Sequence, residues 1–213
     1  MNVLLVAGGS PEDWPAFSVD GFDYVVGIDR GNLFLLERNI IPDLTIGDFD
    51  SLTEEEQGFV FAQAKEILTS PAEKDETDTQ LAVSKVFEKF PNAKIKLIGA
   101  TGGRLDHLLS NLWLGLEPRF FPFLQQLVIQ DKQNHFSYLP PGEHLIQQLP
   151  ETKYLGIICL TAVDNLIINE AKYTLTQTNF ATPISLGSNE FIGKPATVSF
   201  TSGIVAITQN KDA

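Results

Sequence analysis

Short apolar runs alternate with amphipathic stretches over the first 130 residues of the chain. The amphipathic stretches predict a helix that ends near Asn39, a helix that begins after Thr53, and two more at residues 77–89 and 106–116. The apolar runs, bounded by glycine, proline or polar residues, predict strands at residues 3–7, 24–28, 44–46, 67–68 and 94–98. This alternation predicts an α/β domain with a mostly parallel, Rossmann-like sheet and flanking helices.

The pattern changes after about residue 130. Short runs rich in Val, Ile, Thr and Tyr follow Pro140-Pro141-Gly142, at residues 156–162, 166–168, 172–176 and 197–200. No helical apolar period persists there, so we predict a smaller antiparallel β-sandwich over residues 131–213, after the α/β domain of residues 1–130. Strands near Leu127 and Phe136 could belong to either domain.

The chain is acidic, and the excess of acid is uneven. Its 213 residues include 27 acidic and 15 basic side chains, a formal net charge of −12. Residues 1–130 hold 20 of the acids and 10 of the bases. Nucleic acid is therefore excluded as an expected partner, since its backbone is bound mainly by Lys and Arg. The excess is either a solvated surface or, in part, a cation site.

Cysteine usage and the N-terminal segment predict a cytoplasmic protein. The single cysteine, Cys159, lies in an apolar run and is expected to be a buried small side chain, so no disulfide can form within the chain. The first residues carry no basic leader, and their apolar run is too short to cross a membrane. No membrane partner is expected.

Acidic side chains concentrate in residues 43–78, which hold eleven of the 27 acids. The run Glu54–Glu56 is most simply an exposed helix N-terminus. Asp48 and Asp50 flank Phe49 just after Gly47, at a predicted strand end. In an extended segment, side chains two positions apart point to the same side, so both carboxylates could face one Mg²⁺ ion. A turn or capping role is the alternative.

A second acidic segment, Asp75-Glu-Thr-Asp78, lies at a predicted helix start. In one interpretation Asp75 is the N-cap residue and Asp78 is the third helical residue, where the helix dipole favours an acid. In the other, Asp78 supplies a third carboxylate for Mg²⁺ and leaves room for phosphate oxygens. We favour the second interpretation for Asp78.

The segment Ile98–His107 combines glycines with Arg104, Asp106 and His107. Glycine at a strand end permits close approach of a ligand, a helix N-terminus favours anions, and arginine can bind phosphate with two parallel hydrogen bonds. Asp106 could instead be only a cap. The segment is not a Walker A loop, because it lacks the Gly-Lys-Ser/Thr ending. The three histidines do not have the close spacing of a zinc site.

Taken in order, these motifs resemble those of the thiamine pyrophosphokinase family. The matching segments are Gly27–Gly31, Gly47–Ser51, Lys74–Asp78 and Gly102–His107, with Ser188–Phe191 and Val198–Ile204 in the second part. The resemblance implies a nucleotide-binding α/β domain, a thiamine-binding β-sandwich and a homodimer. It also implies a reaction in which thiamine's hydroxyl attacks the β-phosphorus of ATP, giving thiamine diphosphate and AMP, with Mg²⁺.

The resemblance also implies roles for individual residues. Asp48, Asp50 and Asp78 match positions that hold Mg²⁺, and Asp29 matches an acid of the same cleft. Either Asp29 or Asp78 could accept the proton of the thiamine hydroxyl. The expected ATP contacts are Thr77, Arg104, Asp106 and His107, and the expected thiamine contacts are Ser188 and Asn189.

The chain departs from the family pattern at two points. Arg30 follows Asp29 where many relatives have glycine. No tryptophan follows Trp113, so stacking on thiamine would fall to Phe191 or to a residue near Ile204. Two other functions share the acidic cleft: a Mg²⁺-dependent nucleotide pyrophosphohydrolase, and a non-catalytic nucleotide- or cation-binding protein.

Overall fold

The computed structural model describes residues 1–71 and 75–212, which form two compact units. The first unit comprises residues 1–114 and 126–132, and the second comprises residues 115–125 and the chain from residue 133 onward. The predicted domain boundary lies after residue 130. In the structure, the chain enters the second unit for the last time after residue 132, two residues later. The segment 115–125 groups with the second unit.

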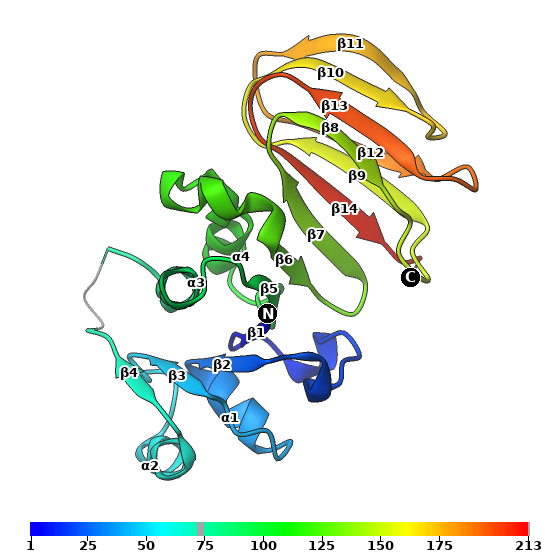
Figure 1. The fold of residues 1–213 in the computed structure, drawn as a ribbon. Coiled ribbons are helices and arrows are strands. Elements are labelled where there is room, and N and C mark those ends of the chain that lie inside the picture. Colours follow the sequence, from blue (N-terminus) through cyan, green and yellow to red (C-terminus); the bar gives the residue numbers. More distant parts are fainter. Residues whose placement is uncertain (72–74, 213) are drawn as a thin grey trace. The chain divides into compact units, whose positions relative to one another are not determined.

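A parallel sheet forms the centre of the first unit (Figure 1). Its strands lie in the order β6-β5-β1-β2-β3-β4, and neighbouring strands pair in parallel. The bounds are β1 Asn2–Val6, β2 Tyr24–Ile28, β3 Leu44–Gly47, β4 Ile67–Thr69, β5 Lys94–Ile98 and β6 Leu127–Gln130. The strand near Leu127 therefore belongs to the parallel sheet.

Helices cover both faces of this sheet, as predicted. Figure 1 shows α1 (Arg30–Leu36) and α2 (Glu54–Gln63) on one face and α3 (Asp78–Lys89) on the other. The strand β1 is apolar on both faces of the sheet, because alternate side chains of a strand point to opposite faces. On the face that α1 covers, Leu4 and Val6 pack with Leu35. A fourth helix, α4 (Leu105–Leu112), follows β5, and short 3₁₀ turns lie at Pro11–Asp13, Val19–Gly21, Leu114–Leu116 and Pro118–Gln126.

Two predictions about helix ends were wrong. The helix predicted to reach residue 116 ends at Leu112, and a 3₁₀ turn with Gly115 at its centre follows. Glycine is a poor helix former, and Pro118 blocks a longer helix. Asp75 is not the N-cap of α3. Thr77 is, through a capping box in which Thr77 and Gln80 exchange side chain to backbone hydrogen bonds, so Asp78 is the first helical residue rather than the third.

The second unit is an antiparallel β-sandwich, which confirms the predicted fold class. Four strands in the order β12-β9-β14-β7 form one layer, and the four-stranded sheet β11-β10-β13-β8 forms the other. A buried core cluster draws on both sheets and includes Ile157, Cys159, Val198 and Ile207. Burial raises the pKa of the Cys159 thiol to about 11, as expected for a packed side chain. The bounds are β7 Asn134–Leu139, β8 Gly142–Ile146, β9 Tyr154–Cys159, β10 Val163–Asn169, β11 Leu175–Phe180, β12 Ile184–Glu190, β13 Ala196–Phe200 and β14 Val205–Asn210.

Some strands of the sandwich differ from the pattern-based prediction. The strand expected at residues 172–176 begins only at Leu175 and continues to Phe180. Strand β12 was not predicted, because most of its residues are exposed and it lacks a run of buried apolar side chains. Its pairing with β9 shifts register between Leu186 and Asn189, where Ser188 has a φ of 60°. The chain therefore bulges at Ser188.

The order of strands reverses between β1 and β5, and the loops that follow these strands touch there. The Gly9 N–H donates to the Gly99 carbonyl at 2.8 Å. A Cβ atom on Gly9 would lie 2.5 Å from that oxygen, so a side chain is excluded from the contact. Ligands of open α/β sheets bind at this kind of reversal, outside the carboxyl ends of the strands. Among the described residues, no helix has both the length and the apolar composition to span a membrane.

The packing of α1 on β1 yields a first prediction. A Cβ atom on Gly31 would lie 2.1 Å from the Val6 carbonyl oxygen, and this contact is backbone that cannot swing aside. We expect Gly31→Ala to lower the free energy of unfolding by about 1–3 kcal/mol. In urea denaturation, the control Gly58→Ala should instead stabilise the protein by about 0.5–1 kcal/mol, because Gly58 is an exposed helical residue with open space around its Cα. Equal effects of the two substitutions would contradict the packing argument.

Candidate active site

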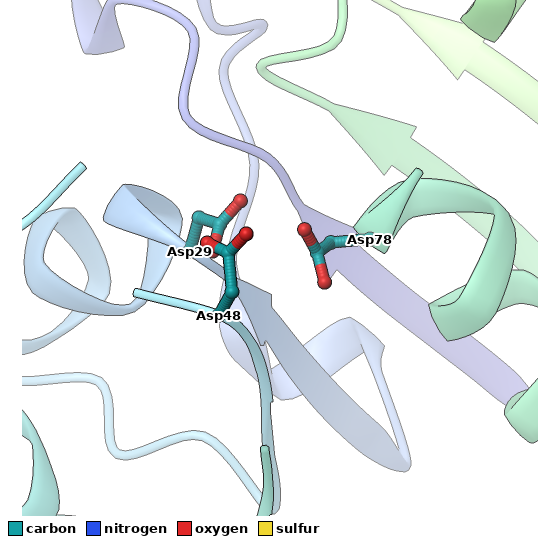
Figure 2. Close-up of side chains that lie close together, drawn as sticks. All are labelled: Asp29, Asp48 and Asp78. Carbon is teal, nitrogen blue, oxygen red and sulfur yellow. The ribbon is translucent and has the colours of Figure 1, made fainter. Parts of the chain in front are cut away.

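Three aspartates from different parts of the first unit point toward one another (Figure 2). Asp29 follows β2, Asp48 follows β3, and Asp78 begins α3. One carboxylate oxygen from each lies within 4.8 Å of the others, and all three residues are half-buried. Such a set of oxygens suits a hard divalent cation.

The backbone around Asp29 is built to bring its carboxylate into the group. Asp29 has a φ of 47°, and its Oδ1 accepts a hydrogen bond from the Phe49 N–H at 3.3 Å. A Cβ atom on Gly47 would lie 2.1 Å from this Oδ1, so only glycine leaves room for it. Burial, and then the charge of Asp78, raise the pKa of Asp29 to about 7. A cation between these carboxylates would relieve the repulsion.

The turn that carries Asp48 is anchored by Phe49. Phe49 has a φ of 60° and is only 2% exposed, and its ring packs edge-on against Phe61 of α2 at a centroid distance of 4.9 Å. The segment is therefore not extended, and the expectation that Asp48 and Asp50 face the same side for that reason was wrong. Asp48 Oδ1 accepts a hydrogen bond from the Asp50 N–H at 3.1 Å, as in an Asx turn.

Asp50 lies beside the group of three. Its side chain is exposed, and the nearby charge of Asp48 is the main cause that raises its pKa. The charge of Arg104 lowers the pKa of the same carboxyl. Asp50 therefore interacts with Asp48 and also with Arg104 of the glycine-rich segment, which lines the same cleft.

Ser70, at the end of β4, supports Asp78. Its hydroxyl donates to Asp78 Oδ1 at 2.8 Å, and its N–H donates to the Gly47 carbonyl at 3.0 Å. Ser70 thus links the Asp78 carboxylate, at the start of α3, to the Gly47 backbone, at the end of β3. Sequence reasoning missed it, and the available signal was its position directly after a strand. Glu73 and Lys74, which belong to the acidic segment and its motif, lie outside the described residues.

A cleft of about 370 Å³ opens at this edge of the sheet. The glycines at the ends of β1 and β5 form part of its wall, and Gly102 and Gly103 have φ values of 77° and 65°. Of the residues predicted to contact ATP, Thr77, Arg104 and His107 line the cleft. Asp29, Asp50 and Arg30 line it too.

Arg104 and Asp106 form an exposed ion pair. Arg104 Nη2 donates to Asp106 Oδ2 at 2.6 Å and Nε donates to Oδ1 at 3.2 Å. The hydrogen bonds from Arg104 are the main cause that lowers the pKa of Asp106 to about 2. Asp106 is not the N-cap of α4, which is Arg104 itself. Because both side chains are more than 60% exposed, a phosphate group can replace Asp106 at little cost.

The residues predicted to contact thiamine lie in the second unit. Ser188 is exposed at the β12 bulge. The side chain of Asn189 is buried and pairs with the backbone of Tyr173, accepting from its N–H at 2.9 Å and donating to its carbonyl at 2.8 Å. Phe191 packs against the core cluster, and Ile204 is 7% exposed. Asn189 therefore holds the bulge in place.

Comparisons with known proteins match both units. A family model described as "Thiamin pyrophosphokinase, catalytic domain" matches residues 18–123, and one described as "Thiamin pyrophosphokinase, vitamin B1 binding domain" matches residues 143–205. A thiamine pyrophosphokinase of Bacillus subtilis (strain 168) is 34% identical over 222 residues, which cover 99% of each chain. The chain belongs to the thiamine pyrophosphokinase family.

Solved structures of family members have the same fold. A thiamin pyrophosphokinase family protein from Enterococcus faecalis is 48% identical with a TM-score of 0.97, and each chain is fully covered. The thiamin pyrophosphokinase of Candida albicans has a TM-score of 0.73 at 17% identity and shares the fold; the match covers 99% of this chain and 89% of that one. Thiamine pyrophosphokinases transfer the pyrophosphoryl group of ATP to thiamine and release AMP. The family assignment thus favours the transferase over the hydrolase and the non-catalytic binding protein.

The crowding of the three aspartates yields a second prediction. Because the pKa of Asp29 rises from 3.8 unfolded to about 7 folded, the folded protein retains a proton that the unfolded chain loses over this range. With divalent metals chelated, stability should therefore fall as the pH rises from about 4 to about 7. Asp29→Asn should remove most of this slope and raise the melting temperature at pH 8 by about 2–5 °C.

Thermal denaturation with EDTA, followed by circular dichroism across this pH range, measures the slope. Glu55→Gln is the matched control, since Glu55 is an exposed acid of the same region. The control should retain the slope of the parent protein. An unchanged slope in Asp29→Asn would show that Asp29 does not carry the buried proton.

Proposed function

We propose that the converging aspartates hold Mg²⁺ and that the cleft beside them binds the triphosphate of ATP. The carboxylates of Asp29, Asp48 and Asp78 fit this cation, because they offer three oxygens within 4.8 Å of one another. Asp50, for which the family resemblance also implies a role at the metal, would supply a fourth carboxylate next to Asp48. The observation that carries the proposal is that three separate segments of the chain direct acidic side chains at one point.

The bound cation would neutralise phosphate charge as the pyrophosphoryl group moves to thiamine. The chain's own residues align the reactants and complete the charge neutralisation. Arg104 supplies a planar donor group at the cleft wall. Asp106 binds this group when ATP is absent, and a phosphate of ATP would take the place of Asp106. Thr77 and His107 line the same wall, and the glycines beside them allow the phosphates to approach the backbone.

We assign Ser188 to direct contact with thiamine and Asn189 to support of that contact. The match to the vitamin B1 binding domain includes both residues. Ser188 is exposed at a bulge, whereas the side chain of Asn189 is used in two hydrogen bonds to Tyr173. We also propose that residues 1–130 form the catalytic part and residues 131–213 the part for thiamine binding and dimerisation.

The proposed assembly is a homodimer in the cytoplasm. The family resemblance supports the dimer, and so do the exposed apolar side chains of the second unit, among them Tyr173 and Ile192 at 58% and 54%. The buried free thiol of Cys159 is compatible with a reducing compartment.

Removing one carboxylate from the metal group tests the proposed magnesium site. Asp48→Asn and Asp78→Asn should each lower turnover more than about tenfold and weaken Mn²⁺ binding in the absence of ATP, because a neutral amide oxygen is a poorer ligand than a carboxylate. Activity is followed as AMP released with thiamine present and omitted, and metal binding by electron paramagnetic resonance of free Mn²⁺.

Glu55→Gln serves again as the control and should match the parent protein in both measurements. Full activity in either aspartate variant would remove that residue from the proposed site. Release of AMP at the same rate without thiamine would instead support the pyrophosphohydrolase.

The thiamine contact is tested separately at Ser188. Ser188→Ala should raise KM for thiamine about 2- to 10-fold, the loss expected for one hydrogen bond, while KM for ATP stays unchanged. Steady-state kinetics with each substrate varied in turn measures both constants. The control is Ser185→Ala, an exposed serine on the same strand. A parallel rise of both KM values would argue against Ser188 in the thiamine site.

A further inference from the structure

Arg30 connects two segments of the first unit that meet beside the cleft. Its two terminal nitrogens pair with the Glu56 carboxylate, Nη1 with Oε1 at 3.3 Å and Nη2 with Oε2 at 3.2 Å. Nη2 also donates to the backbone carbonyl of Ser51. One guanidinium group therefore holds both the turn after β3 and the N-terminus of α2.

Asp29 and Arg30 both form hydrogen bonds to the turn that carries Asp48. The Asp29 carboxylate accepts the Phe49 N–H, and the Arg30 guanidinium donates to the Ser51 carbonyl two residues later. The turn is thus fixed at two points by consecutive residues, one an acceptor and the other a donor. Asp48 lies directly before the first of these points.

Glu56 makes the arginine contact part of a larger bonded unit. The same carboxylate accepts the Thr53 N–H at 2.8 Å and completes the capping box of α2. The side chains of Arg30 and Glu56 are 34% and 29% exposed, so water screens this pair less than it screens Arg104 and Asp106. If Arg30 moved to a phosphate, the Glu56 carboxylate would lose two hydrogen bonds and the Ser51 carbonyl would lose one. Although Arg30 lies at the cleft wall, its guanidinium group is bonded to Glu56 and Ser51 and is therefore not free to bind a phosphate.

We propose that Arg30 is a positioning residue for the metal-binding carboxylates, and that it acts by fixing the Asp48–Ser51 turn through the Ser51 carbonyl and Glu56. The inference rests on the proposed role of Asp48 at the magnesium site. The physical need for it is repulsion, because three carboxylates within 4.8 Å tend to separate unless the backbone restrains them. With Arg30 removed, the turn can relax and Asp48 can move away from its partners.

The decisive measurement is Mn²⁺ affinity without nucleotide, which reports on the carboxylates and not on ATP contacts. Arg30→Ala should weaken Mn²⁺ binding about tenfold, and added guanidinium ion should restore part of it. Arg30→Lys should fall between the parent protein and Arg30→Ala, because an ammonium group cannot bond Ser51 and both Glu56 oxygens in the same planar geometry. Circular dichroism and the melting temperature check that each variant folds.

Arg119→Ala is the matched control. Arg119 pairs with Glu117 at 2.8 Å at similar exposures, 40% and 25%, but in the second unit. Its removal should leave Mn²⁺ affinity unchanged. If Arg30→Ala does not fold, Arg30→Lys and Glu56→Gln give the same test, since each keeps part of the bridge.

Two results would overturn the proposal, and they differ from each other. If Asp48→Asn weakens Mn²⁺ binding but Arg30→Ala leaves it intact and raises KM for ATP, Arg30 contacts ATP and does not position the turn. If neither variant changes Mn²⁺ affinity, the magnesium site itself is wrong. Weaker Mn²⁺ binding in both, with rescue of Arg30→Ala by guanidinium ion, supports the positioning role.

Discussion

The active-site edge of this fold depends on keeping three like charges close together. Asp29, Asp48 and Asp78 repel one another, and burial together with the charge of Asp78 raises the pKa of Asp29 to about 7. The restraint comes from apolar packing and backbone geometry, since Phe49 is buried against Phe61 with a φ of 60°. Burying one aromatic ring contributes about 1.5–3 kcal/mol, which offsets repulsion of that order. The arrangement of the three aspartates therefore depends in part on the packing of Phe49 against Phe61.

The location of the site could be predicted from the sequence, because it follows from local patterns. Short apolar runs mark the buried parallel strands, and the loops at their carboxyl ends must share one edge. The aspartates after residues 28 and 47 and the glycines after residue 98 are therefore neighbours in any such sheet. Their detailed arrangement could not be predicted in this way. The φ of Phe49 depends on Phe61, twelve residues away, and an extended backbone was the wrong local assumption.

Support residues were harder to identify than ligand candidates, because their chemistry is ordinary. Ser70 carries no distinctive motif and Glu56 carries only that of a helix capping box, and their importance comes from partners on other elements: Asp78 for Ser70 and Arg30 for Glu56. Family resemblance does not separate the two kinds of residue either. It placed Ser188 and Asn189 together in the thiamine segment, although Asn189 is buried and bonded to Tyr173. By contrast, the Thr77 capping box follows from the Thr-x-x-Gln spacing, although Asp75, two residues earlier, is also a residue type that favours an N-cap.

The two arginines of the cleft differ in how firmly each is neutralised. Arg104 pairs with Asp106 at exposures above 60%, so a phosphate can displace the aspartate. Arg30 is less exposed and is bonded to Glu56 and to the backbone, so its positive charge is already neutralised by a partner within the protein. Among the described residues that line the cleft, Arg104 is therefore the arginine whose partner a phosphate can replace, and the same wall carries Asp29 and Asp50. The acidic character of the first unit supports the proposed bound metal ion, which would supply further positive charge for a triphosphate.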